Sequence, residues 1–260
     1  MRSFAQALIS SLISALISAL ILALTPALPA RAGSTHVAVA ANFTETAVTL
    51  AAAFKAVTGH EAVLSFGASG ALFMQITQGA PYEVLLSADQ DRPRQAVEAG
   101  LGLDETRVTY AIGALVLWSR DGRATRGDDA LRAGDFRKLA IANPAAAPYG
   151  GAAIETLQAL KLYNELAPKI VQGSSIAQTF QFAETGNAEM AFVALSQVIN
   201  RTDGGRWLVP QSLYKPILQD AVLLKPGATN EAAKAFLAFL KGPQARALIE
   251  RQGYETRGAR

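Results

Sequence analysis

From position 36 onward, short apolar runs alternate along the chain with longer stretches that repeat apolar residues every three or four positions. The runs predict buried strands and the longer stretches predict helices that cover a sheet. In the first third of the chain, the predicted strands are 36–41, 61–66 and 83–87, and the predicted helices are 43–57 and a segment through Leu72, Phe73 and Ile76. Because strands and helices alternate, a parallel sheet with helices on both faces is predicted.

The same alternation resumes after a polar loop at 121–135. Here the predicted strands are 138–142, 169–172 and 190–194, and the predicted helices are 152–160 and 176–185. Two further helical segments, 230–241 and 242–252, close the chain. The sequence therefore contains two α/β units, with a helical end that belongs to one of them.

Two apolar stretches do not fit either unit and predict the connections between them. Residues 109–118 are long for one strand and contain Gly113, and residues 217–224 form a second extended segment. We expect an α/β protein of two lobes, each a mostly parallel sheet flanked by helices, joined by these two crossing strands. The expected lobe I is discontinuous (33–112 and 219–260), and lobe II is 113–218.

The first 32 residues have the features of a cleavable signal peptide. Arg2 precedes a run of Ala, Leu, Ile and Ser at 7–24, a proline follows at position 26, and Ala30 and Ala32 supply the small residues that a signal peptidase requires. A retained membrane helix is the alternative, because the run approaches the ~18–20 apolar residues that span a bilayer. We expect cleavage after Ala32 and a periplasmic location.

Composition excludes several classes of site and partner. Of the 24 basic residues, Arg2 and Arg31 precede the expected cleavage point, so 22 remain against 21 acidic residues. A chain this close to neutral lacks the basic surface of a nucleic-acid-binding protein. The sequence has no cysteine, which excludes disulfides, thiolate metal sites and a lipid anchor on cysteine.

The candidate chemistry lies at four turns that each join a strand to a helix: 41–45, 67–70, 148–151 and 173–176. Each turn offers backbone N–H groups at a helix N-terminus, and such groups bind anions. Ligands of open α/β sheets bind beyond the carboxyl ends of the strands, where these turns lie. Two turns per lobe, facing one another, would surround a compact anion, with Asn42, Ser69, Tyr149 and Ile176 as the candidate ligand-binding residues.

None of the four turns contains Lys, Arg or His, and Glu45 is their only acidic residue. Neutral donors suit a fully ionised oxyanion, whereas a protonated anion would need an acceptor as well. The alternative for each residue is structural. Asn42 and Glu45 match a capping box, Ser69 has the character of a helix cap, and Tyr149 could belong to an ordinary turn.

At these residues the chain resembles the periplasmic molybdate-binding proteins of ABC importers. The similar segments extend over essentially the whole chain after the signal peptide: 37–44, 64–70, 79–90, 110–113, 141–144, 147–150, 178–182 and 192–197. The resemblance implies a type II periplasmic binding protein fold and an oxyanion held by Asn42, Ser69, Tyr149 and Ile176. It also implies molybdate or tungstate as the ligand, no cofactor, and an ABC transporter permease in the inner membrane as the partner.

Two positions, Asn42 and Ala194, depart from parts of that family. Many relatives have serine at the position of Asn42, and an amide can still donate. Some relatives place a tyrosine hydroxyl on the anion from the position of Ala194, which has no side-chain donor, and we expect the Tyr149 hydroxyl to replace it. Other relatives add carboxylates to the metal centre, but Ala147 and its neighbours carry none. We therefore expect recognition of the intact oxyanion and no direct metal coordination.

Sulfate and phosphate are the alternative ligands, and a hydrolytic enzyme is the alternative from another class. The enzyme is disfavoured because only His36 and His60 are present, both expected in solvated loops, and because no nucleophile elbow, phosphate-binding loop or zinc motif occurs. We expect a monomeric binding protein that is not an enzyme.

Overall fold

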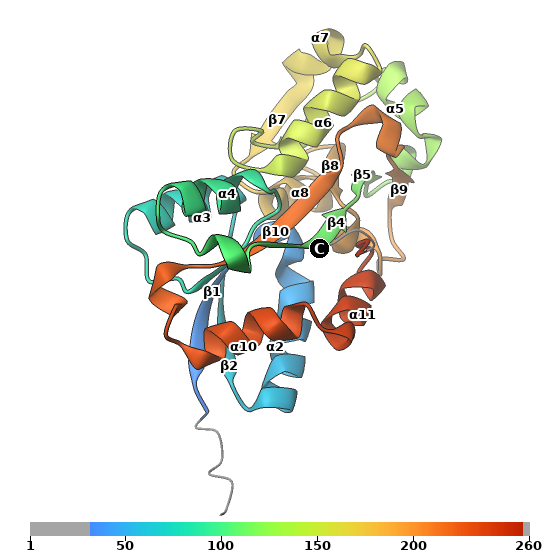
Figure 1. Ribbon diagram of the computed structural model, residues 1–260. Coiled ribbons are helices and arrows are strands. Elements are labelled where there is room, and N and C mark those ends of the chain that lie inside the picture. The colour runs from blue at the N-terminus through green and yellow to red at the C-terminus, as the bar shows by residue number, and fades with distance from the viewer. Residues whose placement is uncertain (1–31, 257–260) are drawn as a thin grey trace, which may run out of the picture. The chain divides into compact units, whose positions relative to one another are not determined.

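The computed structural model describes residues 32–256, so the predicted signal peptide lies outside the described residues except for Ala32. Ten strands form two five-stranded sheets (Figure 1). The strands of the first sheet are β1 (Ser34–Ala40), β2 (Glu61–Gly67), β3 (Val84–Leu86), β4 (Val108–Gly113) and β10 (Ile217–Leu223). Their order is β2-β1-β3-β10-β4, in which β1 pairs in parallel with β2 and β3.

Helices cover both faces of the first sheet because side chains alternate between its faces. Val37 and Val39 pack against α2 (Thr44–Thr58) and α10 (Glu231–Leu240), whereas Ala38 between them faces the opposite side. That opposite side is covered by α3 (Ser69–Thr77) and α4 (Asp91–Glu98). A further helix, α11 (Pro243–Arg251), packs on α2. The C-terminal helices α10 and α11 therefore pack with the first sheet.

The second sheet repeats this arrangement. Its strands are β5 (Leu115–Ser119), β6 (Leu139–Ala142), β7 (Ile170–Gly173), β8 (Met190–Ala194) and β9 (Gly205–Leu208), in the order β7-β6-β8-β5-β9. The helices are α5 (Asp128–Ala133), α6 (Pro148–Ala159), α7 (Tyr163–Leu166), α8 (Ile176–Glu184) and α9 (Leu195–Val198). Buried residues of α5, α6 and α7 share one core cluster, which also includes Ile176 at the start of α8. Ala183 of α8 and Val198 of α9 belong to the cluster on the other face.

Short 3-10 turns connect these elements: η1 (Ala41–Phe43), η2 (Asp104–Thr106), η3 (Arg123–Arg126), η4 (Ala167–Lys169), η5 (Gln211–Leu213) and η6 (Lys225–Gly227). Of these, η1 matters most for the site, because it joins β1 directly to α2. Within the described residues, no helix is long and apolar enough to cross a membrane.

The two predicted crossing segments connect the sheets. Residues 109–118 form β4 in the first sheet and β5 in the second, with only Ala114 between them. The other segment, β10, pairs antiparallel with β3 and β4 and has a bulge between Gln219 and Asp220. In each sheet two strand pairs are parallel and two are antiparallel. The lobe boundaries at 112/113 and 218/219 stay a prediction.

The largest difference from the predicted elements is at α6, which begins at Pro148 and not at residue 152. Proline is favoured in the first turn of a helix because its N–H is missing where none is needed, and its φ is already helical. The two glycines at 150 and 151 suggested a turn, but they lie inside the first turn of the helix. Tyr149 is therefore a helical residue. The sequence also did not predict β9, α4, α7 or α9, and the segment 121–135, predicted as a polar loop, contains α5.

Candidate functional site

The four predicted turns meet at one small cavity of about 10 Å³. Asn42, Ser69, Tyr149 and Ile176 all line it. The remaining lining residues are small or apolar: Ala40, Ala41, Ala68, Ala88, Ala147 and Pro148. A cavity of this size, near the space that one water molecule needs, suits only a compact ligand. None of the described residues that line it is charged.

Each turn presents a backbone N–H from the beginning of a helix. Asn42 lies in η1, Ser69 and Ile176 are the first residues of α3 and α8, and Tyr149 is the second residue of α6. N–H groups in a first helical turn have no acceptor within their own helix. In the described part of the chain these four N–H groups also donate to no acceptor elsewhere. Four helix N-termini, each with the positive end of its dipole, therefore converge on one cavity.

The first turn of α6 leaves one backbone N–H without an acceptor. Pro148 has no N–H, and the N–H groups of Gly150 and Gly151 both reach the carbonyl of Ala147, at 2.9 and 3.4 Å. Only the N–H of Tyr149 remains in this turn. A proline followed by two glycines thus leaves the helix with one unpaired donor at the cavity.

Asn42 is buried, and its side chain does not cap a helix. The capping-box alternative is wrong, because α2 begins at Thr44 and no side chain caps it. The amide Nδ2 of Asn42 instead donates to Gln219 Oε1 and to the Tyr254 hydroxyl, each at 3.0 Å. The Asn42 carbonyl accepts a hydrogen bond from Ser196 Oγ at 2.9 Å and lies 2.8 Å from the Tyr254 hydroxyl. These contacts hold the η1 turn in place beside the cavity.

Ser69 is also buried and does not act as a cap. The residue before α3 is Ala68, and no side chain caps this helix. Ser69 Oγ accepts a hydrogen bond from the N–H of Ala88 at 2.9 Å, and Ala88 itself lines the cavity. Because the oxygen is used as an acceptor, the hydroxyl hydrogen remains for donation. Ser69 can therefore offer an oriented O–H and an N–H from the same residue.

The Tyr149 side chain extends from α6 to the crossing strands. Its hydroxyl accepts a hydrogen bond from Gln219 Nε2 at 3.2 Å, and a Cβ placed at Gly113 would lie 2.1 Å from the hydroxyl oxygen. Burial raises the pKa of the Tyr149 hydroxyl well above the usual value of 10.0, and the nearby Tyr254 and Tyr110 raise it further. The hydroxyl therefore remains protonated, and a donor, at any physiological pH.

The Gln197 side chain links Ile176 and Ala194 in the second lobe by hydrogen bonds to both. The carbonyl of Ile176 accepts a hydrogen bond from Gln197 Nε2 at 3.2 Å, and the N–H of Ala194 donates to Gln197 Oε1 at 2.9 Å. Ser175 caps α8 through the N–H of Gln178. Ile176 lines the cavity with no polar side chain, so only its N–H is suited to a ligand.

Hydrogen bonds bridge the two lobes beside the cavity. The N–H of Gly70 donates to the carbonyl of Ala146, and Arg92 Nη2 donates to the carbonyl of Ala145, each at 2.9 Å. Ser196 Oγ donates to Asn42 across the same cleft. The turns of both lobes are thus fixed relative to one another around the cavity.

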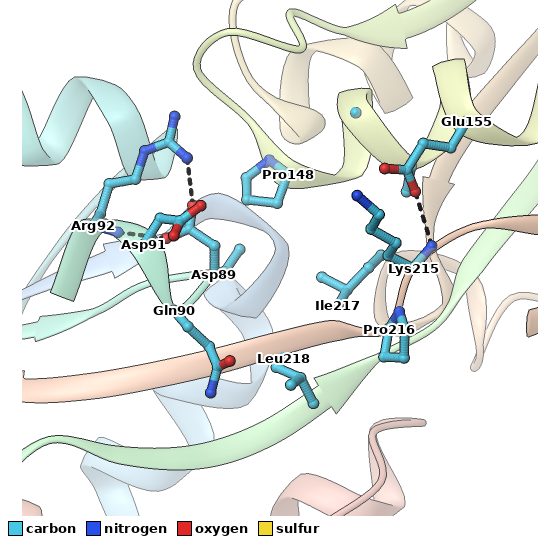
Figure 2. A pocket seen from close by; sticks show the side chains of 13 residues that line it. Asp89, Gln90, Asp91, Arg92, Pro148, Glu155, Lys215, Pro216, Ile217 and Leu218 are labelled. Atoms are coloured by element: carbon cyan, nitrogen blue, oxygen red, sulfur yellow. Dashed lines mark hydrogen bonds and ion pairs between the residues drawn. The ribbon is translucent and has the colours of Figure 1, made fainter. Parts of the chain in front are cut away.

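A larger pocket of about 310 Å³ adjoins the cavity and shares Ala88 and Pro148 with it (Figure 2). Three carboxylates (Asp89, Asp91 and Glu155) and two cations (Arg92 and Lys215) line it. Figure 2 shows Asp89 paired with Arg92, so part of the positive charge there is already neutralised. The carboxylates outnumber the cations, so this pocket suits an anion less well than the small cavity, whose described lining residues carry no charge.

Sequence reasoning missed the second layer of side chains around the site. Gln219, Tyr254 and Ser196 hold Asn42, and Gln219 also holds Tyr149. One signal was present: Gln219 and Asp220 are adjacent polar residues within an otherwise apolar strand.

The histidines are remote from this network. His36 is an exposed residue of β1, not of a loop, and His60 accepts a hydrogen bond from the N–H of Gly33.

Several known proteins are similar to this chain over most of its length. The molybdate-binding protein ModA of Rhodobacter capsulatus is 54% identical over 230 residues, covering 88% of this chain and 91% of that protein. ModA of Azotobacter vinelandii is 46% identical over 232 residues, covering 88% and 92%. The solved structure of the periplasmic molybdate-binding protein of Azotobacter vinelandii matches with a TM-score of 0.82 and 39% identity, covering 85% of this chain and 98% of that one.

A family model described as bacterial extracellular solute-binding protein matches residues 35–255. The match includes both sheets and all four turns of the cavity. The family is one of binding proteins and not of enzymes. This chain belongs to the bacterial extracellular solute-binding protein family.

Proposed function

We propose that this protein captures molybdate, and tungstate nearly as well, in the small cavity and delivers it to an ABC transporter permease. The observation that carries the proposal is the convergence of four unpaired helix N-terminal N–H groups on one neutral cavity. The similarity to molybdate-binding proteins of two other bacteria identifies the oxyanion.

The donors define the charge state of the ligand. An oxyanion bound by N–H and O–H groups alone presents acceptors on every side, as fully ionised molybdate does. Hydrogen phosphate would bring a hydrogen that requires an acceptor, and a buried donor facing another donor costs about 1–3 kcal/mol. Sulfate carries the same charge as molybdate but is smaller, so the donors of a pocket sized for molybdate would lie too far from its oxygens.

The remaining assignments follow from the same proposal. Asn42, Ser69, Tyr149 and Ile176 contact the oxyanion, with no metal–protein bond and no cofactor. The chain is exported by a signal peptide cleaved after Ala32 and acts in the periplasm as a monomer. Lobe I (33–112 and 219–260) and lobe II (113–218) close on the anion by a hinge at Gly113 and β10, and the closed form docks on the permease.

Ligand titration of the mature protein tests the function. At ~100 times its dissociation constant, a ligand stabilises the folded state by ~2.7 kcal/mol, which for a domain of this size raises the melting temperature by roughly 5–10 °C. We expect this rise with molybdate and tungstate, and a much smaller one with sulfate or phosphate at equal concentration. A larger rise with sulfate or phosphate would overturn the assignment.

Replacing Ser69 with alanine tests the site. Loss of one hydrogen bond to a charged ligand costs about 1.5–3 kcal/mol, so molybdate affinity should fall roughly 10- to 150-fold. The matched control is Ser87→Ala, because Ser87 is equally buried and bonds Asp89 but does not line the cavity. Calorimetric titration of both variants should separate them. Equal affinity of the Ser69→Ala variant and the unaltered protein would remove Ser69 from the site.

A further inference from the structure

Gln219 is a fully buried amide on the crossing strand β10, at the bulge that separates it from Asp220. A buried amide requires partners for its donor and its acceptor, because each unpaired group costs free energy. Apart from Tyr110 on the neighbouring strand β4, the partners of Gln219 are not on adjacent strands. They come from elements that carry the oxyanion site.

The two ends of this amide face opposite lobes. Gln219 Oε1 accepts from Asn42 Nδ2 at 3.0 Å and lies 3.2 Å from the Tyr110 hydroxyl, whereas its Nε2 donates to the Tyr149 hydroxyl at 3.2 Å. Asn42 belongs to the η1 turn of the first lobe, and Tyr149 belongs to α6 of the second. One side chain thus joins two of the four turns that line the cavity, from a strand that runs between the lobes.

The orientation of the amide determines what the Tyr149 hydroxyl can do. An Asn42 nitrogen can only donate, so it must meet the oxygen of Gln219, and this leaves the Gln219 nitrogen for Tyr149. The Tyr149 oxygen therefore accepts, and its single hydrogen remains to be donated. In residues 32–256 no acceptor receives that hydrogen, although Tyr149 is 1% exposed and lines the cavity.

We propose that Gln219 is a positioning residue of the oxyanion site, which orients the Asn42 amide and the Tyr149 hydroxyl together and leaves the Tyr149 hydrogen for the ligand. The inference rests on the proposed function, because it assigns that hydrogen to the same oxyanion. It makes Gln219 a determinant of affinity although Gln219 does not line the cavity. It also couples the closure of the lobes to the formation of the donor set.

A double-mutant cycle between Gln219 and Tyr149 tests the proposal. The variants are Gln219→Met, which has a similar length and no hydrogen bonds, Tyr149→Phe, and the two combined. Molybdate affinity and dissociation rate are measured by calorimetry and stopped-flow fluorescence, and the melting temperature of each ligand-free variant is measured separately. We expect each single change to lower affinity about tenfold or more, and the combined change to lower it little further, because both remove the same donor.

The matched control is Asp220→Asn. Asp220 lies at the same bulge and is equally buried, but its side chain bonds Gln90, Arg107 and Thr109, none of which lines the cavity. We expect this variant to lose stability and keep its molybdate affinity. If Gln219→Met does not fold, Gln219→Asn replaces it in the cycle, because the shorter amide stays polar and cannot reach both partners.

Losses that multiply in the combined variant would overturn the proposal, as would a Gln219 variant that binds molybdate as well as the unaltered protein. Failure of the proposed function gives a different result. In that case the unaltered protein itself shows no melting shift with molybdate, and the assignment of Gln219 fails with it.

Discussion

Replacing Gly150 with alanine is expected to destabilise the protein and to weaken oxyanion binding strongly. A Cβ at this position would lie 2.0 Å from the carbonyl oxygen of Ala142 and 3.0 Å from the nitrogen of Pro144. These are backbone atoms, so the clash is relieved only if α6 moves away from β6. Overpacking of this kind costs about 1–3 kcal/mol, which lowers the melting temperature by roughly 2–12 °C. The shift of α6 also moves the N–H of Tyr149, and molybdate affinity should fall roughly 10- to 150-fold.

The neighbouring glycine provides the control. A Cβ at Gly151 would meet no atom within 4 Å, and both glycines lie in the first turn of α6. Gly151→Ala should therefore keep molybdate affinity and gain up to about 1 kcal/mol of stability, since alanine is the better helix former. Thermal unfolding and calorimetric titration of both variants distinguish the two positions. Similar behaviour of the two variants would mean that the approach of α6 to β6 does not position the donor.

Much of this arrangement was predictable from local sequence. The segments 37–40 and 190–194 are continuous apolar runs that form buried strands, and parallel pairing places the carboxyl ends of such strands at one edge of a sheet. The turns that follow them carry helix N-termini because helices follow strands in this class of fold. Asn42, Ser69, Tyr149 and Ile176 could therefore be assigned to one site before any contact between them was known.

The partners of those residues were not predictable in the same way. Asn42 bonds Gln219 and Tyr254, which are 177 and 212 positions away along the chain. Nothing in the local sequence of Asn42 indicates them, and the match to a capping box suggested a nearer partner. Long-range hydrogen bonds depend on how the lobes fold together. The sequence neighbours of Asn42 alone therefore suggested a helix cap, although its amide is buried and bonds distant residues.

The neutral character of the cavity lining was predictable from the sequence, but the directions of the hydrogen bonds around it were not. The absence of charged residues from the turns, apart from Glu45, already indicated neutral donors. Only the structure shows which hydroxyl hydrogens remain for donation. The N–H of Ala88 donates to Ser69 Oγ, and Gln219 Nε2 donates to the Tyr149 hydroxyl oxygen. These second partners use the Ser69 and Tyr149 oxygens as acceptors and so leave both hydroxyl hydrogens for donation, which suits the fully ionised oxyanion proposed above.

Gly113→Ala is expected to affect binding more than stability. A Cβ at Gly113 would lie 2.1 Å from the Tyr149 hydroxyl oxygen and 2.6 Å from Gln219 Nε2. Gly113 does not have a positive φ, so alanine brings no backbone strain, and the cost falls on the two side chains. Because the end of a tyrosine side chain can move, we expect a stability loss of about 1–2 kcal/mol. Displacement of the hydroxyl should lower molybdate affinity roughly 10- to 100-fold.

The same substitution in the Tyr149→Phe background shows where the effect arises. Phenylalanine lacks the oxygen that the new Cβ would meet first, and the contact with Gln219 Nε2 at 2.6 Å remains. In this background Gly113→Ala should therefore cost less affinity and less stability than in the unaltered protein. Titration of the four proteins with molybdate gives the ratio of affinities in each background. A large ratio in the first background and a small one in the second places the effect at the Tyr149 hydroxyl, because both backgrounds share the same crossing strand. Equal ratios would instead place the effect in the strand itself, where alanine at the last residue of β4 would restrict the proposed hinge.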